Sequence, residues 1–177
     1  MSNFLNYNES VSFSADNNLN NVLYNEGDNH AIVIFSNIFR TSKQEILLYA
    51  KNIFSDKNEV TTSSNYINSL IGFLGNEDVK LKILLTEYNP EKDNNLLREN
   101  IIKYKDKITI RINNKQSIKR ESKPIHFCIG DNRMYRLEYD IKKRKAICNF
   151  NDVTSCTKFT SFFNQLFLSS SAQESFI

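Results

Sequence analysis

The decisive stretch of this sequence is IHFCIGDNRMYRLE, residues 125–138. Apolar and polar residues alternate on both sides of the turn-forming residues 130–132, a pattern that predicts a β-hairpin. A two-residue turn would place His126 opposite Leu137 and would mix apolar and charged side chains on both faces. A three-residue turn places His126 opposite Arg136 and separates the two kinds of side chain, so we expect this register.

The three-residue turn gives the predicted hairpin one apolar face and one polar face. The apolar face carries Ile125, Phe127, Ile129, Tyr135 and Leu137, and the polar face carries His126, Cys128, Arg136 and Glu138. Residues directly opposite each other in a hairpin share a face. We therefore expect an imidazole, a guanidinium and a carboxylate to lie side by side on an open sheet surface.

The rest of the chain alternates between helical and strand patterns. Helices are predicted over residues 30–40, 63–74 and from Asp93 or Asn94 to 104, and strands over 45–54, 79–87 and 108–112. This order is typical of crossover units on a parallel sheet. Three short strands then follow at 124–130, 133–139 and 145–150, and a last helix at about 153–168. The sequence predicts an α/β fold whose mixed sheet is flanked by helices and ends in a β-meander and a helix.

Length and composition favour one domain. The chain has 177 residues, of which 40% are hydrophobic, enough for a single core. We expect a poorly anchored arm at residues 1–29, a domain at 30–168 and a polar tail at 169–177. The longest apolar runs are about five residues, against roughly 20 for a bilayer span, and the polar start lacks a secretory signal, so we expect a cytoplasmic protein without membrane contact.

Cationic residues gather in two runs near the C-terminal third, although the net charge is only +3. The first run contains Lys115, Lys119, Arg120 and Lys123, and the second contains Lys142, Lys143, Arg144 and Lys145. One interpretation is two solvated loops. The other is a one-sided electrostatic surface for phosphates. Three cysteines without C-x-x-C spacing indicate free thiols.

The hairpin, the order of the preceding elements, the later Asn149-Phe150-Asn151 and the Phe-rich last helix together resemble a phospholipase D-like domain over roughly residues 31–168. Tyr135-Arg136-Leu137-Glu138 is similar to a short branch of such domains. In that family a His-x-Lys-x4-Asp motif supplies a histidine that attacks a phosphodiester phosphorus, and the histidine of a second motif protonates the leaving oxygen. The resemblance implies that Lys and Asn side chains bind the non-bridging oxygens.

The sequence departs from the family motif at two positions. Cys128 stands where the family has Lys, and Arg133 stands where it has Asp. The resemblance therefore assigns only His126, as the nucleophile, and Asn149 and Asn151, as phosphate ligands. With a single motif in the chain, catalysis would require a homodimer with the two copies of His126 near its axis.

The hairpin register adds further candidates for the site. Arg136 would hold the phosphate in place of the missing Lys, and Glu138 would orient the imidazole or hold the guanidinium. Lys123 and Lys145, from the two basic runs, are further phosphate-binding candidates. The alternatives are structural: His126 as an ordinary strand histidine, Arg136 with Glu138 as a surface ion pair, and the asparagines as caps.

Two functional hypotheses follow. In the first, the protein binds or cleaves a phosphodiester, most simply nucleic acid, through His126 and Arg136. In the second, it is a catalytically degenerate scaffold that acts as a sensor or protein-interaction subunit, for example in bacterial (anti-phage) defence. No P-loop, dinucleotide-binding, zinc-protease or G-x-S-x-G motif occurs, so we expect neither a cofactor nor a metal.

Overall fold

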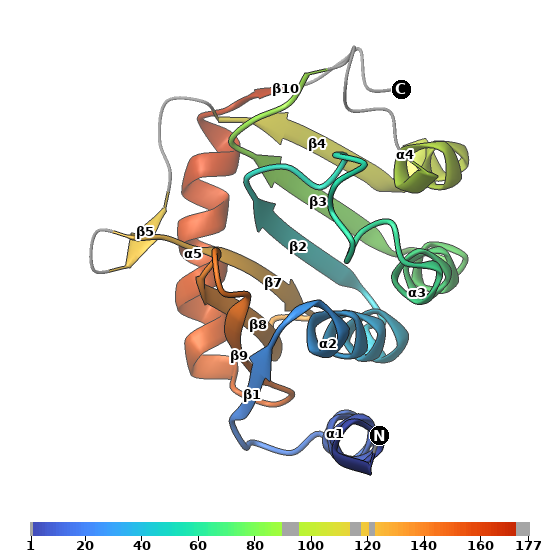
Figure 1. The fold of residues 1–177 in the computed structure, drawn as a ribbon. Coiled ribbons are helices and arrows are strands. Elements are labelled where there is room, and N and C mark those ends of the chain that lie inside the picture. Colours follow the sequence, from blue (N-terminus) through green and yellow to red (C-terminus); the bar gives the residue numbers. More distant parts are fainter. Residues whose placement is uncertain (1, 90–95, 114–117, 121–122, 173–177) are drawn as a thin grey trace.

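A mixed sheet of eight strands lies between two layers of helices in the computed structural model, which describes residues 2–89, 96–113, 118–120 and 123–172. The strand order is β1-β9-β8-β7-β2-β3-β4-β10. Helices α1 to α4 lie on one side of the sheet and α5 lies on the other (Figure 1). This confirms the predicted α/β class with its mixed sheet, meander and late helix.

The helices are α1 (Ser2–Asp16), α2 (Asp28–Thr41), α3 (Ser64–Leu74), α4 (Leu96–Ile101) and α5 (Val153–Leu168), with a 3₁₀ helix, η1 (Ile102–Lys107). The strands of the main sheet are β1 (Leu23–Glu26), β2 (Glu45–Ala50), β3 (Lys80–Leu85), β4 (Ile108–Ile112), β7 (His126–Gly130), β8 (Met134–Asp140), β9 (Lys145–Asn149) and β10 (Ser171–Ala172). A separate pair consists of β5 (Lys119–Arg120) and β6 (Lys123–Pro124). Within the described ranges, no helix combines the length and apolar character that crossing a bilayer requires.

The parallel half of the sheet follows the sequence pattern closely. Strands β2, β3 and β4 are parallel and are joined by α3 and by α4 with η1. Ile46 and Leu48 of β2 face the core under α2 and α3, whereas Leu47 and Tyr49 face α5. Burial on both faces explains why this strand is a continuous apolar run. The predicted helix start at residues 93–94 lies outside the described residues.

The hairpin of β7 and β8 pairs in a register different from the one we predicted. His126 lies opposite Glu138, not opposite Arg136, and Arg136 lies opposite Cys128. The turn does have three residues, but they are 131–133.

Pairing with β2 and a close contact with the end of α2 account for the shifted turn. Gly130 belongs to β7 because it pairs with Ile46. A Cβ at Gly130 would lie 2.5 Å from Ser42 Oγ, so the position requires glycine for its packing and not for the turn. Asp131 supplies the turn instead: its φ is 50°, and its carboxylate accepts hydrogen bonds from the backbone N–H groups of residues 43–45.

The shift does not change which hairpin residues share a face. The predicted apolar set packs under α5, against Phe163 and Phe167 among others. The other face is not an open surface, however: Cys128 is in the core under α2 and α3, and Arg136 and Glu138 are only 3% and 2% exposed. The predicted polar cluster therefore forms, but in a buried setting.

The N-terminal 29 residues contain two ordered elements where the sequence predicts a poorly anchored arm. Helix α1 buries Val11 and Ala15 in the main core. Strand β1 pairs with β9 at the edge of the sheet, and its one buried residue is the polar Asn25. So few apolar anchors leave no clear period in the sequence. At the other end, β10 pairs with β4, within the segment predicted as a tail.

Candidate functional site

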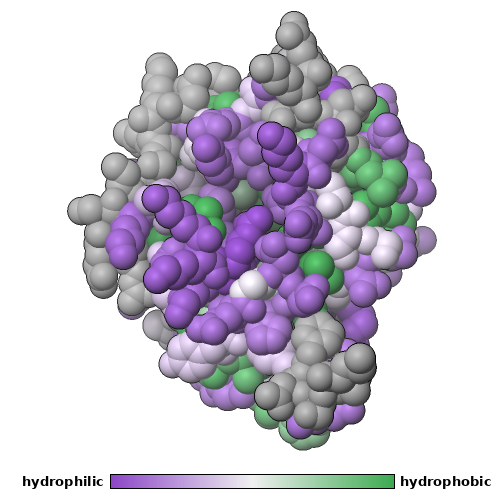
Figure 2. Space-filling view, viewed as in Figure 1, coloured by the Kyte–Doolittle hydropathy of each residue, from purple (hydrophilic) through white to green (hydrophobic). Residues whose placement is uncertain are grey.

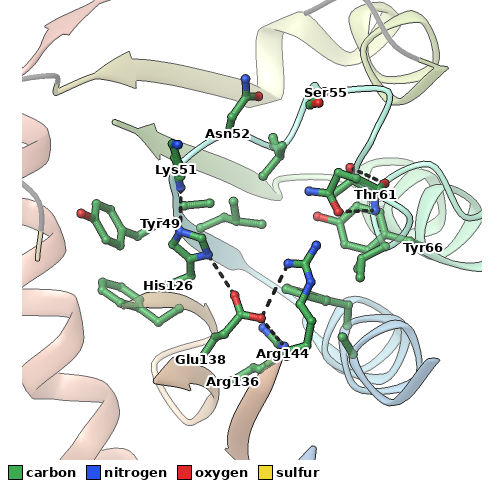
Figure 3. Close-up of a pocket in the computed structure, with 18 of the residues that line it drawn as sticks. Tyr49, Lys51, Asn52, Ser55, Thr61, Tyr66, His126, Arg136, Glu138 and Arg144 are labelled. Carbon is green, nitrogen blue, oxygen red and sulfur yellow. Dashed lines mark hydrogen bonds and ion pairs between the residues drawn. The ribbon is translucent and has the colours of Figure 1, made fainter. Parts of the chain in front are cut away.

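A pocket of about 330 Å³ opens at the carboxyl end of β2, beside the start of β7. Its walls come from β2 and the loop that follows it, from α2 and α3, and from β7, β8 and the turn between β8 and β9 (Figure 3). His126, Arg136 and Glu138 all line it. The carboxyl end of parallel strands is the usual position of ligand sites in open α/β sheets.

Glu138 is the centre of the buried polar cluster. Its Oε2 lies 2.9 Å from Nδ1 of His126, and its Oε1 lies 3.2 Å from Nη2 of Arg136 and 3.7 Å from Nη1 of Arg144. Burial alone would raise the pKa of Glu138, but the His126 hydrogen bond and the charges of both arginines outweigh burial, so the pKa lies below its ordinary value. The carboxylate is therefore ionised at neutral pH.

Both ring nitrogens of His126 have protein partners. The backbone N–H of Lys51 donates to Nε2 at 3.0 Å. Because a backbone amide can only donate, Nε2 is the acceptor and Nδ1 carries the hydrogen that is donated to Glu138. The imidazole is thus fixed in one tautomer and one orientation, with its Nε2 lone pair engaged.

Arg136 is held by the protein on several sides. Its Nε donates to Oδ1 of Asn25 at 2.9 Å, its Nη2 contacts Glu138, and its guanidinium carbon lies 5.0 Å from the centre of the Phe35 ring. The side chain is only 4% exposed. Arg136 therefore contributes positive charge to the pocket while its Nε and Nη2 donors serve the fold.

Asn25 connects the N-terminal strand to both arginines of the pocket. Besides accepting from Arg136, it donates through Nδ2 to the carbonyl oxygens of Gly27 and Arg144, both at 3.1 Å. Asn25 is 1% exposed. Strand β1 is thus part of the structure that positions the site. This role could not be predicted, because a lone Asn in an Asn-rich segment carries no periodic signal.

Arg144 is the more accessible of the two arginines, and nothing in the sequence distinguishes it from the rest of its basic run. It lies in the turn after β8 with a φ of 52°, and its side chain is 30% exposed. Its Nε forms an ion pair with Oδ1 of Asp28 at 2.8 Å. Lys51 and Lys57, from the loop after β2, also line the pocket. Lys51 could have been found, since it directly follows a buried strand.

Tyr66 of α3 also lines the pocket, although its place in the sequence predicts only that it lies on the apolar face of a helix. Its side chain is fully buried and its hydroxyl has no hydrogen-bond partner in the described part of the chain. Burial raises the pKa of this hydroxyl, so it stays protonated and can donate. In Figure 3 the ring of Tyr66 enters the pocket from the α3 side, whereas Arg144 enters from the strands.

The remaining predicted phosphate ligands do not line this pocket. Asn149 lies opposite Tyr135 on the face covered by α5, where it donates to Asn20 and accepts from the backbone N–H of Asn151. Lys145 forms an ion pair with Glu26 at 3.0 Å. Lys123 is exposed on β6. The structure therefore brings together the three hairpin residues and leaves these four outside.

The three cysteines lie in the folded interior of the domain. Cys128 and Cys148 lie opposite Arg136 on either side, and burial raises the pKa of each thiol to about 12. All three cysteines are buried and unpaired, as the sequence predicts. The described residues contain no group of three or more His, Cys, Asp or Glu side chains placed to hold a metal ion.

No protein-family model matches this sequence, and a search of the curated proteins finds no significant match. Solved structures do match. An archaeal chromatin protein, TrmBL2, whose structure shows a novel mode of DNA binding, aligns with a TM-score of 0.61 at 19% identity, over 93% of this chain and 60% of its own. This chain thus spans less than two thirds of TrmBL2.

Two further matches carry the classification. Nuc from Salmonella typhimurium, a phospholipase D family member, aligns with a TM-score of 0.59 at 12% identity, over 88% of this chain and 99% of its own. NucT from Helicobacter pylori aligns with a TM-score of 0.56 at 9% identity, over 86% of this chain and all of its own. The chain therefore has the fold of a phospholipase D-like domain, as the hairpin residues predict.

Proposed function

We propose that this protein binds a phosphate group of nucleic acid in the pocket beside His126, and that it does so without cleaving the phosphodiester. The observation that carries the proposal is the charge of the pocket. Four cationic side chains line it, those of Lys51, Lys57, Arg136 and Arg144, against the carboxylates of Glu87 and Glu138. Lys51 and Arg144 also have acidic partners, Glu87 and Asp28, that an incoming phosphate can replace.

The surroundings of the pocket favour a polyanion over a small anion. The turn that supplies Arg144 also carries Lys142 and Lys143, both exposed. Lys123, which precedes His126 by three residues in the sequence, is also exposed. Hydrophilic side chains cover most of the centre of the face seen in Figure 2. These lysines are the cationic partners that we propose for phosphates extending beyond the pocket.

Binding without cleavage is the proposal because the catalytic positions of the family motif serve the fold here. Because Nδ1 of His126 is hydrogen-bonded to Glu138, Nε2 is the nitrogen that would have to attack, and it accepts a hydrogen bond from the backbone N–H of Lys51. Cys128, at the Lys position, lies in the core. Arg133, at the Asp position, donates to the backbone carbonyls of Phe150 and Thr41.

A second candidate is phosphodiester hydrolysis, favoured by one contact. Glu138 orients the imidazole through Nδ1, the arrangement that activates a nucleophilic histidine. Attack would require the Lys51 peptide to release Nε2, and a second copy of His126 from a homodimer to protonate the leaving oxygen. A sensor or regulatory role, such as one in bacterial defence, is compatible with binding alone.

One experiment separates binding from hydrolysis. The full chain and a His126→Ala variant are incubated with labelled single-stranded DNA and RNA, and both retention and fragment lengths are measured. We expect both proteins to bind and neither to produce fragments. Fragments formed by the wild type but not by His126→Ala would establish the second candidate instead. If neither protein binds, the proposal is wrong.

A further inference from the structure

We infer that the pocket takes a terminal phosphate, a phosphomonoester at the end of a nucleic acid chain, and that the hydroxyl of Tyr66 donates a hydrogen bond to it. This inference rests on the proposed function and adds the class of ligand to it. It also assigns a binding role to a residue that the family motif does not contain.

The unpartnered hydroxyl of Tyr66 is the first observation. Its ring is held by edge contacts with Phe35, at 5.2 Å between ring centres, and with Phe39, at 5.0 Å. These contacts fix the direction of the hydroxyl, which is buried without a hydrogen-bond partner among the described residues. A buried donor without an acceptor is unfavourable, so a phenylalanine would serve better if packing were the only role. An acceptor oxygen from a ligand would complete the site.

The graded exposure of the cationic groups is the second observation. Arg136 and Tyr66 are 3% and 0% exposed, whereas the Arg144 side chain is 30% exposed and that of Lys51 is 60% exposed. We expect a ligand that reaches buried Tyr66 to contact the more exposed Arg144 and Lys51 as well, since all three line the pocket. A phosphate at the end of a chain needs only one route out of the pocket for its ester oxygen, whereas an internal phosphate needs two.

The number of donors is the third observation. A terminal phosphate has three non-bridging oxygens and a charge between −1 and −2, whereas a diester has two such oxygens and one charge. Tyr66, Arg144 and Lys51 come from α3, the β8–β9 turn and the end of β2, so they approach from different sides (Figure 3). Three donors on three sides fit three oxygens better than two.

The test compares oligonucleotides that differ only at one end. The full chain is titrated with a 3′-labelled single strand bearing either a 5′-phosphate or a 5′-hydroxyl, and with a 5′-labelled strand bearing a 3′-phosphate, at one salt concentration. We expect a phosphorylated end to bind about tenfold or more tightly than its hydroxyl counterpart. A nucleoside monophosphate then competes with the phosphorylated oligonucleotide. Weak displacement of the oligonucleotide shows that the site takes the end of a chain, whereas full displacement shows that it takes a free nucleotide and overturns the inference.

A Tyr66→Phe variant separates a ligand contact from a packing role. Removing an unpaired buried hydroxyl should leave the melting temperature unchanged or raise it, while the preference for the phosphorylated end falls to near onefold. Equal affinity of the wild type for phosphorylated and hydroxyl ends, with binding still reduced by Arg144→Gln, would overturn the inference and leave the proposed function standing. If the wild type and Arg144→Gln bound every strand equally, both the inference and the proposed function would be overturned.

Discussion

The Nε2 atom of His126 accepts a hydrogen bond from the backbone N–H of Lys51 at 3.0 Å, at the point where β2 ends. This single contact joins the residue that the family resemblance assigns as nucleophile to the loop that supplies two cations of the pocket. It keeps the imidazole pointing into the pocket, but with its lone pair already used. His126, which would be the nucleophile in hydrolysis, therefore instead holds the loop after β2 in place at the edge of the pocket.

Acid should weaken the fold through Glu138. Its pKa is lower in the folded protein than its ordinary value near 4.5, so its contribution is fully present above that value and is lost as the pH falls through the folded-state pKa. Urea unfolding between about pH 7 and pH 3 measures this loss. In Glu138→Gln the free energy of unfolding should depend less on pH over the same range. An equal pH dependence in both proteins would show that Glu138 is not its source.

The buried ion pair of Arg136 and Glu138 should show strong coupling. Glu138→Gln leaves Arg136 without its carboxylate in a buried site, and we expect it to lower the free energy of unfolding by about 3–5 kcal/mol. Arg136→Met should also destabilise. In the double variant the loss should be smaller than the sum by about 1–3 kcal/mol. Strict additivity in a urea double-mutant cycle would contradict the contact at 3.2 Å.

Asn25 should matter for both stability and ligand binding. Asn25→Ala removes hydrogen bonds to Arg136, Gly27 and Arg144, so we expect a loss of about 1–3 kcal/mol and weaker nucleic acid binding than in the wild type. Asn68→Ala is the matched control, because Asn68 is exposed on α3. Chemical unfolding and anisotropy titration measure the two effects. Equal behaviour of the two variants would show that β1 does not position the site.

Two glycines should respond to alanine in opposite directions. Gly130→Ala places a methyl group 2.5 Å from Ser42 Oγ and 2.8 Å from Met134 Cε, so we expect a loss of about 1–3 kcal/mol in the free energy of unfolding. Gly72→Ala, in α3, meets no atom within 4 Å and should gain about 0.5–1 kcal/mol. If Gly130→Ala were neutral, the close approach of Ser42, at the end of α2, to Gly130 would be wrong.

The central strands could be predicted because burial on both faces leaves a direct record in the sequence. Strand β2 is a continuous apolar run, and β3 has Leu81, Ile83 and Leu85 at alternate positions. The hairpin alternates so regularly that even a shifted register keeps the correct faces together. The register itself could not be predicted, since it depends on Gly130 fitting beside Ser42, a residue far away in the sequence. Helix α1 and strand β1 could not be predicted either, because the residues that anchor them are few and partly polar.

Some residues of the candidate site could be predicted from the sequence and others could not. His126, Arg136 and Glu138 could be predicted because one hairpin carries all three. Tyr66 and Arg144 could not, because their approach to the hairpin depends on how α3 and the β8–β9 turn pack around it. Asn149 was predicted by resemblance to the family, and the structure places it on the other face of the sheet, under α5.

The position of the bound phosphate is most directly measured by nuclear magnetic resonance. The full chain, labelled with ¹⁵N, is titrated with a short single-stranded oligonucleotide, and the backbone amide of Lys51, the ring of His126 and the side-chain Nε–H of Arg144 are followed. These signals should shift together and saturate with one affinity, while the amide of exposed Lys158 on α5 stays unchanged. Shifts confined to the α5 surface, or none at the pocket under conditions where the oligonucleotide binds, would contradict a phosphate site beside His126.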